Sequence, residues 1–468
     1  MSTAWRQRLL LALPFLFGIA VLQGLTVEID TFHGSDARVY QLPTILQFRD
    51  GLDLADYPSA QTPLYHVLTA WWGELVGFEL WKLRLLNVLF SYAMALALLR
   101  LLERATPLGS WQAFWLTLLF VLSPYVFGVS FTLLTDNLAI LFALVAIERV
   151  HAHWRTGSGA AFAIACLAIC AALLTRQAFV WLLPLAAFFL VSGPASPGVK
   201  VAGLGGLVVA LVPLGMLALE WDGLVPPSAD PASCGLCEDR AGLAREALTL
   251  RSVGFTIALM GAYGAVLFGV AALRRLKPTS RELAPIVLER ARTQGIGVAA
   301  ATLAGTGPKQ ERREVTGALR ARARRVLDPR LILLAAGAGV ALLLISPLLY
   351  LPITPDNAGD AGWLWKLSDE FPELLGSSLL FWLLVPLGCV VTALLASRAG
   401  PLSLAPVLLA CFLLAALPVR LSYQKYFDPF VLVVLALLAV RADLLRRCDY
   451  AGLGLLCAAF VAYALSFA

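Results

Sequence analysis

Long runs of apolar residues, separated by short polar segments, extend over most of the chain. The runs are rich in Leu, Ala, Val and Phe and lack the strict alternation of a half-buried strand, so they predict helices. A helix needs about 20 apolar residues to cross the hydrocarbon core of a bilayer. By this criterion about thirteen segments qualify as spans, centred near residues 18, 93, 121, 142, 167, 186, 210, 261, 341, 384, 408, 433 and 459.

The first apolar run, Leu9 to Val27, is longer than a signal-peptide core and has no small-residue cleavage site, so we expect a retained anchor. Composition agrees with membrane residence, because 60% of the 468 residues are hydrophobic and only 14% are charged. In lipid, helices and closed barrels are the structures that satisfy the backbone. The pattern therefore predicts an all-α polytopic membrane protein, with one transmembrane domain over residues 1–468.

Charged residues divide the loops between two faces. Residues 273–330 carry 14 Lys or Arg and 5 Asp or Glu, which predicts a cytoplasmic loop. Counting spans in both directions from this loop places residues 28–82 and 220–250 on the opposite face. Both segments are acidic, with 8 acids against 3 bases in the first and 6 against 2 in the second. Within residues 28–82, apolar spacing and several Trp residues predict helices that lie in the interface plane.

Two of the eight cysteines, Cys234 and Cys237, fall in the second of these outer loops, in the stretch CGLC. A zinc site needs more ligands than these two, and no His or second Cys pair is close in sequence. Two interpretations stay open: the two cysteines form a local disulfide, or both are free thiols. The outer loops contain no His or Asp-x-Asp cluster, so we expect neither a metal nor a cofactor.

Candidate chemistry begins just past the first span, in the stretch DTFHGSDARVYQ at residues 30–41. A carboxylate at the headgroup level is well placed to act on a lipid-linked substrate, and Asp36 fits the role of a general base for an attacking hydroxyl. The alternative is that Asp30 and Asp36 cap the short helix expected near Ala37. His33 lies between the two acids. On the residues alone both interpretations stand.

Cations recur near later span ends on the same face. Arg176 and Gln177 lie between two closely spaced apolar runs in LLTRQAFVW, and Lys425 lies in LPVRLSYQKYFDPF. Inserting a cationic side chain at membrane depth costs about 2.5 to 3.5 kcal/mol on insertion scales, so such a residue is expected to have an anionic or polar partner. Phosphate suits both guanidinium and ammonium, whereas snorkelling to water is the alternative. Asp136 in SFTLLTDNLAIL either serves such a site or caps the returning helix.

Six segments carry a resemblance to a known family: DARVYQLPTILQFRDG, DYPSAQTPLY, LRLLNVLFS, LSPYVFGVSFTLLTDN, TRQAFVW and LSYQKYFDPF. Their order resembles the GT-C superfamily of integral membrane glycosyltransferases. More narrowly, it is similar to the dolichyl-phosphate-glucose-dependent alpha-1,2-glucosyltransferases, the Alg10/Die2 family. Lys425 stands where that family has Arg, Asp136 stands where it has Glu, and its Asp-Glu pair is reduced to Asp36, with Asp30 the fallback. The basic loop and CGLC have no clear counterpart.

The resemblance implies an enzyme that moves a hexose, expected to be glucose, from a polyprenyl-phosphate-linked donor to a lipid-linked or cell-surface glycan. The transfer would be inverting and independent of metal, with Asp36 as the catalytic base. The donor phosphate would be held by Arg176, Lys425, Arg84 and Tyr426. The sugar or the acceptor would contact Asp56, Asp136, Gln177, Tyr65 and His33.

Two other functions stay open. A GT-C mannosyl, arabinosyl or aminoarabinosyl transferase would use the same loops. A lipid-linked sugar flippase or transporter would normally show internal repeats and charges deep in several spans, whereas the ionisable residues here gather at one face. Expected partners are the lipid-linked donor, the acceptor and membrane lipids, without nucleic acid. The expected location is a bacterial or archaeal plasma membrane, or the endoplasmic reticulum in a eukaryote, with the active site on the extracytoplasmic face.

Overall fold

Helices make up almost all of the part of the chain that the computed structural model describes. The described residues are 3–21, 23, 25–26, 36–105, 110–229, 250–275, 328–345, 362–400, 402–417, 424–441 and 450–465. Within them, a short antiparallel hairpin pairs β1 (Glu373–Leu374) with β2 (Ser377–Ser378). The predicted all-α class is confirmed.

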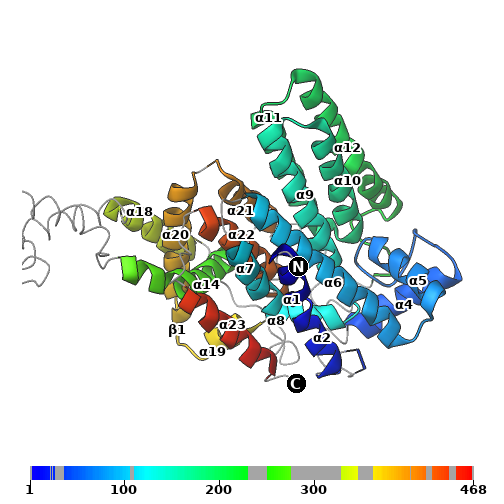
Figure 1. Ribbon diagram of the computed structural model, residues 1–468, viewed down its shortest axis with the longest axis horizontal. Helices are drawn as coiled ribbons and strands as arrows, with labels where there is room; N and C mark the ends of the chain where they lie inside the picture. The colour runs from blue at the N-terminus through cyan, green and yellow to red at the C-terminus, as the bar shows by residue number, and fades with distance from the viewer. Residues whose placement is uncertain are drawn as a thin grey trace, which may run out of the picture.

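The first half of the chain forms the helices α1 to α12, coloured from blue to green in Figure 1. They are α1 (Thr3–Leu10), α2 (Leu13–Ala20), η1 (Ala37–Gln41), α4 (Leu42–Asp50), α5 (Leu64–Val76), α6 (Leu80–Ala105), α7 (Ser110–Leu122), α8 (Pro124–Phe127), η2 (Gly128–Phe131), α9 (Asp136–Thr156), α10 (Gly159–Thr175), η3 (Gln177–Trp181), α11 (Leu182–Ser192) and α12 (Pro197–Glu220). The second half forms the helices α14 to α23. Its helices are α14 (Arg251–Arg275), α18 (Pro329–Ile345), α19 (Trp363–Asp369), α20 (Leu379–Ala399), α21 (Leu404–Ala416), α22 (Gln424–Arg441) and α23 (Tyr450–Leu465).

Several helices are suited to a bilayer. Among the described residues, four are long and apolar enough to cross it, namely α6, α12, α20 and the first 18 residues of α14. A fifth candidate span is broken, because α7 and the short segment of α8 and η2 meet at a bend of 69°. Each predicted span centre lies inside a helix. The full number of crossings stays a prediction.

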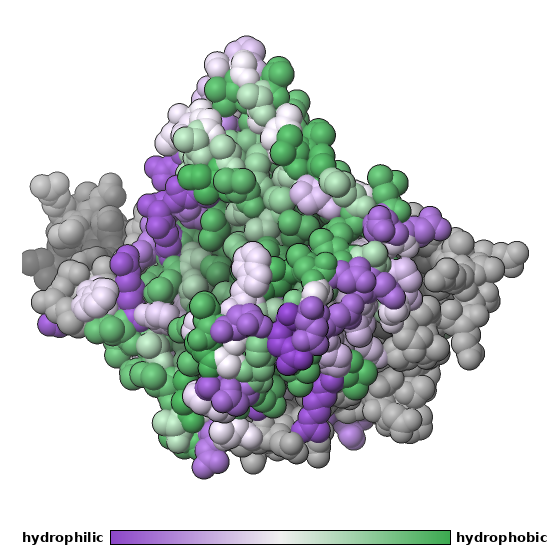
Figure 2. All heavy atoms as spheres, turned by 90° about the vertical axis from the view of Figure 1, so that its right-hand side faces the viewer, coloured by the Kyte–Doolittle hydropathy of each residue, from purple (hydrophilic) through white to green (hydrophobic). Residues whose placement is uncertain are grey.

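The outer faces of these helices are apolar enough for contact with lipid. On α10 and α12, the side chains of Leu167, Val208 and Leu219 are 72%, 65% and 85% exposed. Figure 2 shows this side of the molecule as a broad hydrophobic surface, with many of the hydrophilic residues gathered toward its lower part. Exposed apolar patches of this extent mark a membrane or a partner. Together with the spanning helices, they identify an integral membrane protein.

The first apolar run, Leu9 to Val27, for which a retained anchor is expected, is described at residues 9–21, 23 and 25–26. The chain forms two short helices there, α1 and α2, separated at Leu11 and Ala12. Pro14 stands in the first turn of α2, where it has no N–H to donate and its ring opposes a continuous helix. The break lies inside the expected anchor, and retention of this run stays a prediction.

Two groups of helices meet around the site (Figure 1). In the first group α9, α10, α11 and α12 pack against one another, and α6 packs along α9. In the second group α14 lies against α20, α22 and α23, and α18 lies against α20. Helix α21 joins the groups, because it contacts η3 and α11 on one side and α22 on the other.

The described part of the acidic segment 28–82 contains η1, α4 and α5, with non-helical backbone at residues 51–63 and 77–79. The helices expected between residues 28 and 82 are thus present from residue 36 onward. The CGLC stretch in residues 220–250, most of the basic segment 273–330, Asp30 and His33 lie outside the described residues. The loop assignments for these segments stay predictions.

Candidate active site

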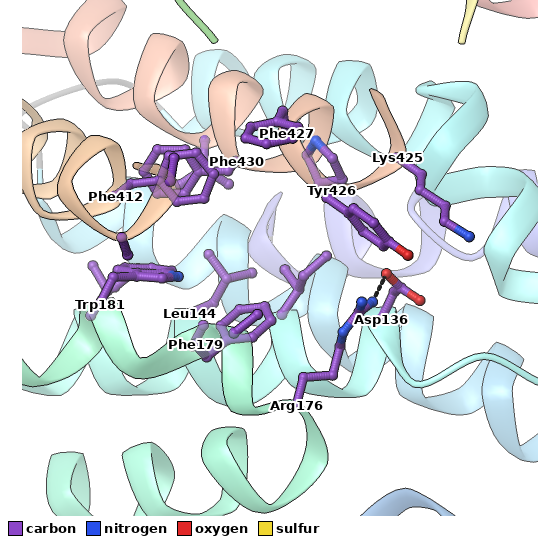
Figure 3. Close-up of a pocket in the computed structure, with 18 residues that line it drawn as sticks. Asp136, Leu144, Arg176, Phe179, Trp181, Phe412, Lys425, Tyr426, Phe427 and Phe430 are labelled. Carbon is purple, nitrogen blue, oxygen red and sulfur yellow. Dashed lines mark hydrogen bonds and ion pairs between the residues drawn. The ribbon is translucent and has the colours of Figure 1, made fainter. Parts of the chain in front are cut away.

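One cavity brings together side chains from three distant segments (Figure 3). Its volume is about 250 Å³, and its polar end is formed by Asp136, Arg176, Lys425 and Tyr426. Asp136 begins α9, Arg176 links α10 to η3, and the other two belong to the first turn of α22. These four residues, all singled out from the sequence, share one space.

Arg176 is positioned by the break between α10 and η3. Its backbone is extended, with φ −152° and ψ 119°, while its N–H still donates to the carbonyl oxygen of Ala172. Its Nη1 forms a buried ion pair with Oδ1 of Asp136, and its Cζ lies 4.7 Å from the ring centroid of Tyr426. A carboxylate and an aromatic face therefore take the place of the water that a snorkelling arginine would reach.

Asp136 begins α9 without capping it. Thr135 is the N-cap residue, and its side chain makes no capping hydrogen bond with the described backbone. The carboxylate of Asp136 points at the guanidinium of Arg176 instead (Figure 3). The neighbouring Asn137 is also occupied elsewhere, because its amide donates to the hydroxyl of Ser91. In this arrangement Asp136 orients the arginine.

Lys425 contacts Asp36, which lies just before η1. Its Nζ lies 3.0 Å from Oδ2 of Asp36, and its side chain is 4% exposed, against 21% for Asp36. Asp36 directly precedes the π-helical turn η1, yet its side chain makes no capping hydrogen bond with the described backbone. The ring centroid of Tyr426 lies 5.2 Å from Nζ of Lys425. The proposed proton acceptor thus faces the proposed phosphate-binding lysine.

The remainder of the cavity is apolar and follows the faces of helices. Residues of α9 line it at helical spacing after Asp136, as far as Ile147, which is roughly 16 Å along the helix axis. On the opposite wall, Phe412 of α21 stacks on Phe430 of α22 with 3.6 Å between ring centroids. Trp181 of η3 meets both rings edge-on. These aromatic residues were not predicted from the sequence, because aromatic residues in apolar helices usually belong to the hydrophobic core.

Buried polar contacts fix the segment that follows Asp36. Nε2 of His66 in α5 lies 2.6 Å from Oε1 of Gln41 in η1. Burial lowers the pKa of His66 to about 3, so the imidazole is neutral and its Nε2–H donates to Gln41. Burial also raises the pKa of Tyr65 in the same helix, and the charge of Asp136 raises it further. The Tyr65 hydroxyl has no hydrogen-bond partner among the described residues.

The remaining predicted residues lie apart from the cavity lining. Arg84 is buried in α6 and donates from Nη1 to a main-chain carbonyl between α2 and η1. Asp56 accepts hydrogen bonds from the N–H and the hydroxyl of Ser228. Gln177 donates to two main-chain carbonyls of the outer loops. The structure brings none of these three into the described lining, and His33 lies outside the described residues.

A second polar cluster lies behind the first turn of α22. Asp428 is fully buried, and its carboxylate accepts hydrogen bonds from the hydroxyls of Ser123 and Tyr263 and from the amide of Gln424. The only signal for it in the sequence is a carboxylate three residues after Lys425, inside a predicted span. The cluster ties the turn that carries the cavity lysine to α14 and to the bend between α7 and α8.

The polar end of the site carries two cations and two carboxylates in close pairs. A guanidinium and an ammonium that both lie close to one aromatic ring suit the oxygens of a phosphate. Asp36 does not line the cavity, but it contacts Lys425, which does, and a carboxylate is able to accept a proton. Among the described residues, no three His, Cys, Asp or Glu side chains gather as metal ligands. The site therefore has an end with paired cations and carboxylates, and an apolar remainder.

No protein-family model matches this chain, and no curated protein does. Two crystal structures resemble it weakly. ArnT from Cupriavidus metallidurans bound to undecaprenyl phosphate has a TM-score of 0.41 and 14% identity, with 94% of this chain and 79% of that chain covered. ArnT from the same organism in the apo state has a TM-score of 0.36 and 18% identity, with 91% and 77% covered. At such scores, function has to be inferred from the residues of this chain.

Proposed function

We propose that this chain is an integral membrane glycosyltransferase of the GT-C type, which transfers a hexose from a polyprenyl-phosphate-linked donor to a hydroxyl of a lipid-linked or cell-surface glycan. One observation carries the proposal. An ammonium and a guanidinium stand at one end of a cavity that continues as an apolar groove between α9, α21 and α22 (Figure 3). A polyprenyl phosphate has the same division into an anionic head and an apolar chain.

The donor binds in one orientation for reasons of charge and burial. Arg176 and Lys425 take the phosphate oxygens, since the guanidinium forms paired hydrogen bonds and the ammonium acts as a point charge. The polyprenyl chain lies against Phe412, Phe430 and the apolar face of α9, where each buried CH₂ contributes about 0.8 kcal/mol. Tyr426 keeps the two cations apart and in place through its ring.

Asp36 acts as the base in this proposal. Its carboxylate takes the proton of the acceptor hydroxyl, and the hydroxyl oxygen forms a bond to the anomeric carbon of the donor sugar. The bond between that carbon and the phosphate oxygen breaks, and its electron pair leaves with the polyprenyl phosphate. The transfer inverts the anomeric configuration. Lys425 and Arg176 stabilise the charge that grows on the leaving phosphate in a site with little water.

The identity of the sugar is inferred from the six resembling sequence segments, which favour glucose. The sugar lies between the phosphate site and the outer segment, so the residues nearest to it are those around Asp136 and the buried Tyr65. Tyr65 offers a hydroxyl that is not used by other described residues. Asp56, Gln177 and Arg84 hold loops and helices in place around this space.

The first prediction concerns Asp36→Asn, which keeps the size of the side chain and removes the base. Turnover should fall by at least about 10²-fold. The measurement is transfer of labelled glucose from a short-chain polyprenyl-phosphate glucose to lipid-linked acceptors, by purified protein in detergent. Asp50→Asn is the matched control, because Asp50 is an exposed carboxylate at the end of α4 paired with Arg49, and it should keep the wild-type rate. A wild-type rate in Asp36→Asn would remove Asp36 from the chemistry.

The same preparation separates the competing functions. Donors that carry mannose, arabinose or aminoarabinose are compared side by side with the glucose donor, and the fastest transfer identifies the sugar class. Reconstituted vesicles test the transporter class. Wild-type protein that moves an intact lipid-linked sugar across the bilayer, without releasing the lipid phosphate, would replace the enzyme proposal by a flippase.

A further inference from the structure

Asp36 and Lys425, the proposed base and a proposed phosphate ligand, form an ion pair with each other. Nζ of Lys425 and Oδ2 of Asp36 are 3.0 Å apart in a largely buried ion pair. In the second pair, Asp136 holds Arg176. Each cation that would bind the donor phosphate is therefore already neutralised by a carboxylate, and one of those carboxylates is the base.

The donor phosphate adds a negative charge to a group of two cations and two carboxylates whose charges already cancel. The four groups sum to zero, so a phosphodiester at the cations leaves one negative charge in excess beside an apolar cavity. Like charges close together in a medium of low dielectric repel strongly. The phosphate and the carboxylate of Asp36 therefore compete for the same ammonium.

The structure indicates which of the two carboxylates moves away from its cation when phosphate binds. Asp136 lies at the start of α9, a helix of 21 residues whose N-terminus favours a negative charge, and its side chain is 12% exposed. The side chain of Asp36 is 21% exposed and precedes a π-helical turn of only five residues. The Asp36 carboxylate is therefore the more exposed of the two and lacks the long helix that favours the charge of Asp136, so it is the easier one to move toward solvent.

We propose that the donor phosphate displaces Asp36 from Lys425, so that the base is released only when the donor is in place. This inference rests on the proposed function and adds an order to it: the donor binds first, and the acceptor hydroxyl is deprotonated afterwards. Without donor, the ammonium holds the carboxylate away from any acceptor. Lys425 thus links substrate binding to base activity.

The test uses undecaprenyl phosphate as the probe, with binding measured on the purified full-length protein in detergent. Asp36→Asn removes the competing anion, so undecaprenyl phosphate should bind roughly tenfold more tightly than to the wild type. Lys425→Met should bind it at least about tenfold more weakly. In the double variant the benefit of Asp36→Asn should vanish, because competition needs the ammonium. Asp50→Asn should bind as the wild type does.

A measurement on the wild-type protein supports or overturns the same inference without any variant. A carbodiimide joins a carboxylate to an amine in direct contact, so it should form an amide between Asp36 and Lys425, detected by mass spectrometry of the linked peptides. Undecaprenyl phosphate should lower the yield of this product severalfold. An unchanged yield with the lipid bound would overturn the displacement.

The outcomes separate the two proposals. If Lys425→Met weakens binding and Asp36→Asn leaves it unchanged or weaker, the displacement is wrong and the donor site stands. If the wild type does not bind undecaprenyl phosphate, or binds it equally well without Lys425, the proposed function itself fails.

Discussion

At the scale of single residues, the packing of α5 against η1 depends on a histidine that stays neutral. His66 is fully buried in α5, a helix outside the spanning segments, and burial lowers its pKa from 6.5 to about 3. In the unfolded chain the same imidazole takes up a proton below about pH 6.5. Between these two values the unfolded state binds the proton and the folded state does not. Stability is therefore complete above pH 6.5 and decreases as the pH falls.

A prediction follows for the pH dependence of unfolding. Lowering the pH from 7.5 to 5.0 should remove about 2 kcal/mol of unfolding free energy through His66, at 1.36 kcal/mol for each pH unit below 6.5. His66→Gln keeps a donor for Gln41 and does not titrate, so it should lose less. The measurement is the thermal midpoint in detergent at both pH values. Parallel decreases for the wild type and the variant would show that His66 does not titrate on unfolding.

Some residues of the site were readable from the sequence and others were not. Arg176 and Lys425 were visible because a cation inside an apolar run is rare and needs a reason. The pair of Asp36 with Lys425 was not readable, because its members are 389 positions apart and periodicity reports only on neighbours. The sequence shows Asp428 only as a carboxylate three residues after Lys425, whereas the fold places three hydrogen-bond donors around it.

At the scale of elements, the crossing of α14 and α20 brings two backbones into contact. A Cβ placed on Gly388 of α20 would collide with the carbonyl oxygen of Ile257, and one placed on Gly261 of α14 would collide with that of Leu384. Small residues permit such close packing of helices in membranes. This contact matters for the site, because α14 carries Tyr263, whose hydroxyl donates to Asp428 of α22.

Gly388→Ala should therefore lower the unfolding free energy by about 1 to 3 kcal/mol, because the added methyl group forces the two backbones apart. Gly337→Ala on α18 is the control, since a Cβ there meets only open space, and it should be neutral or slightly stabilising. Thermal unfolding in detergent measures both. Equal midpoints for the two variants would show that the crossing tolerates a side chain.

The apolar runs predicted the helices well, because the thickness of the hydrocarbon core sets a similar length for every spanning helix. Every predicted centre lies within a helix, yet two elements differ in shape. The first run is divided before Pro14, and the run near residue 121 bends by 69° at Ser123. A proline was the available signal in both cases, since Pro124 follows the second break. Whether a proline bends or divides a helix depends on the helices packed around it. The sequence of one apolar run gives no information about those neighbours.

At the scale of the whole molecule, the cavity lies where two groups of helices meet and α21 bridges them. The groove therefore has walls from both halves of the chain. Its affinity for a lipid should depend on the length of the chain as well as on the phosphate, because each additional buried CH₂ adds to binding.

Ala415→Phe tests this dependence. Ala415 of α21 is half-buried and lines the groove, so a larger side chain there should weaken binding of undecaprenyl phosphate by roughly tenfold or more, through overlap with the chain. Binding of a short-chain analogue, geranyl phosphate, should change little. Ala163→Phe adds the same ring to an exposed position of α10 and should leave both lipids unaffected. Equal losses for the two lipids in Ala415→Phe would place the chain elsewhere.

The two ion pairs of the site differ greatly in the length of chain that they enclose. Asp136 and Arg176 are 40 positions apart, on consecutive helices, so both partners enter the membrane almost together during synthesis. Lys425 follows Asp36 by 389 positions, and the helices between them, from η1 to α21, have to be made first. The proposed centre is therefore incomplete in any chain that stops before α22, so a truncated product of that kind would contain Asp36 without its lysine.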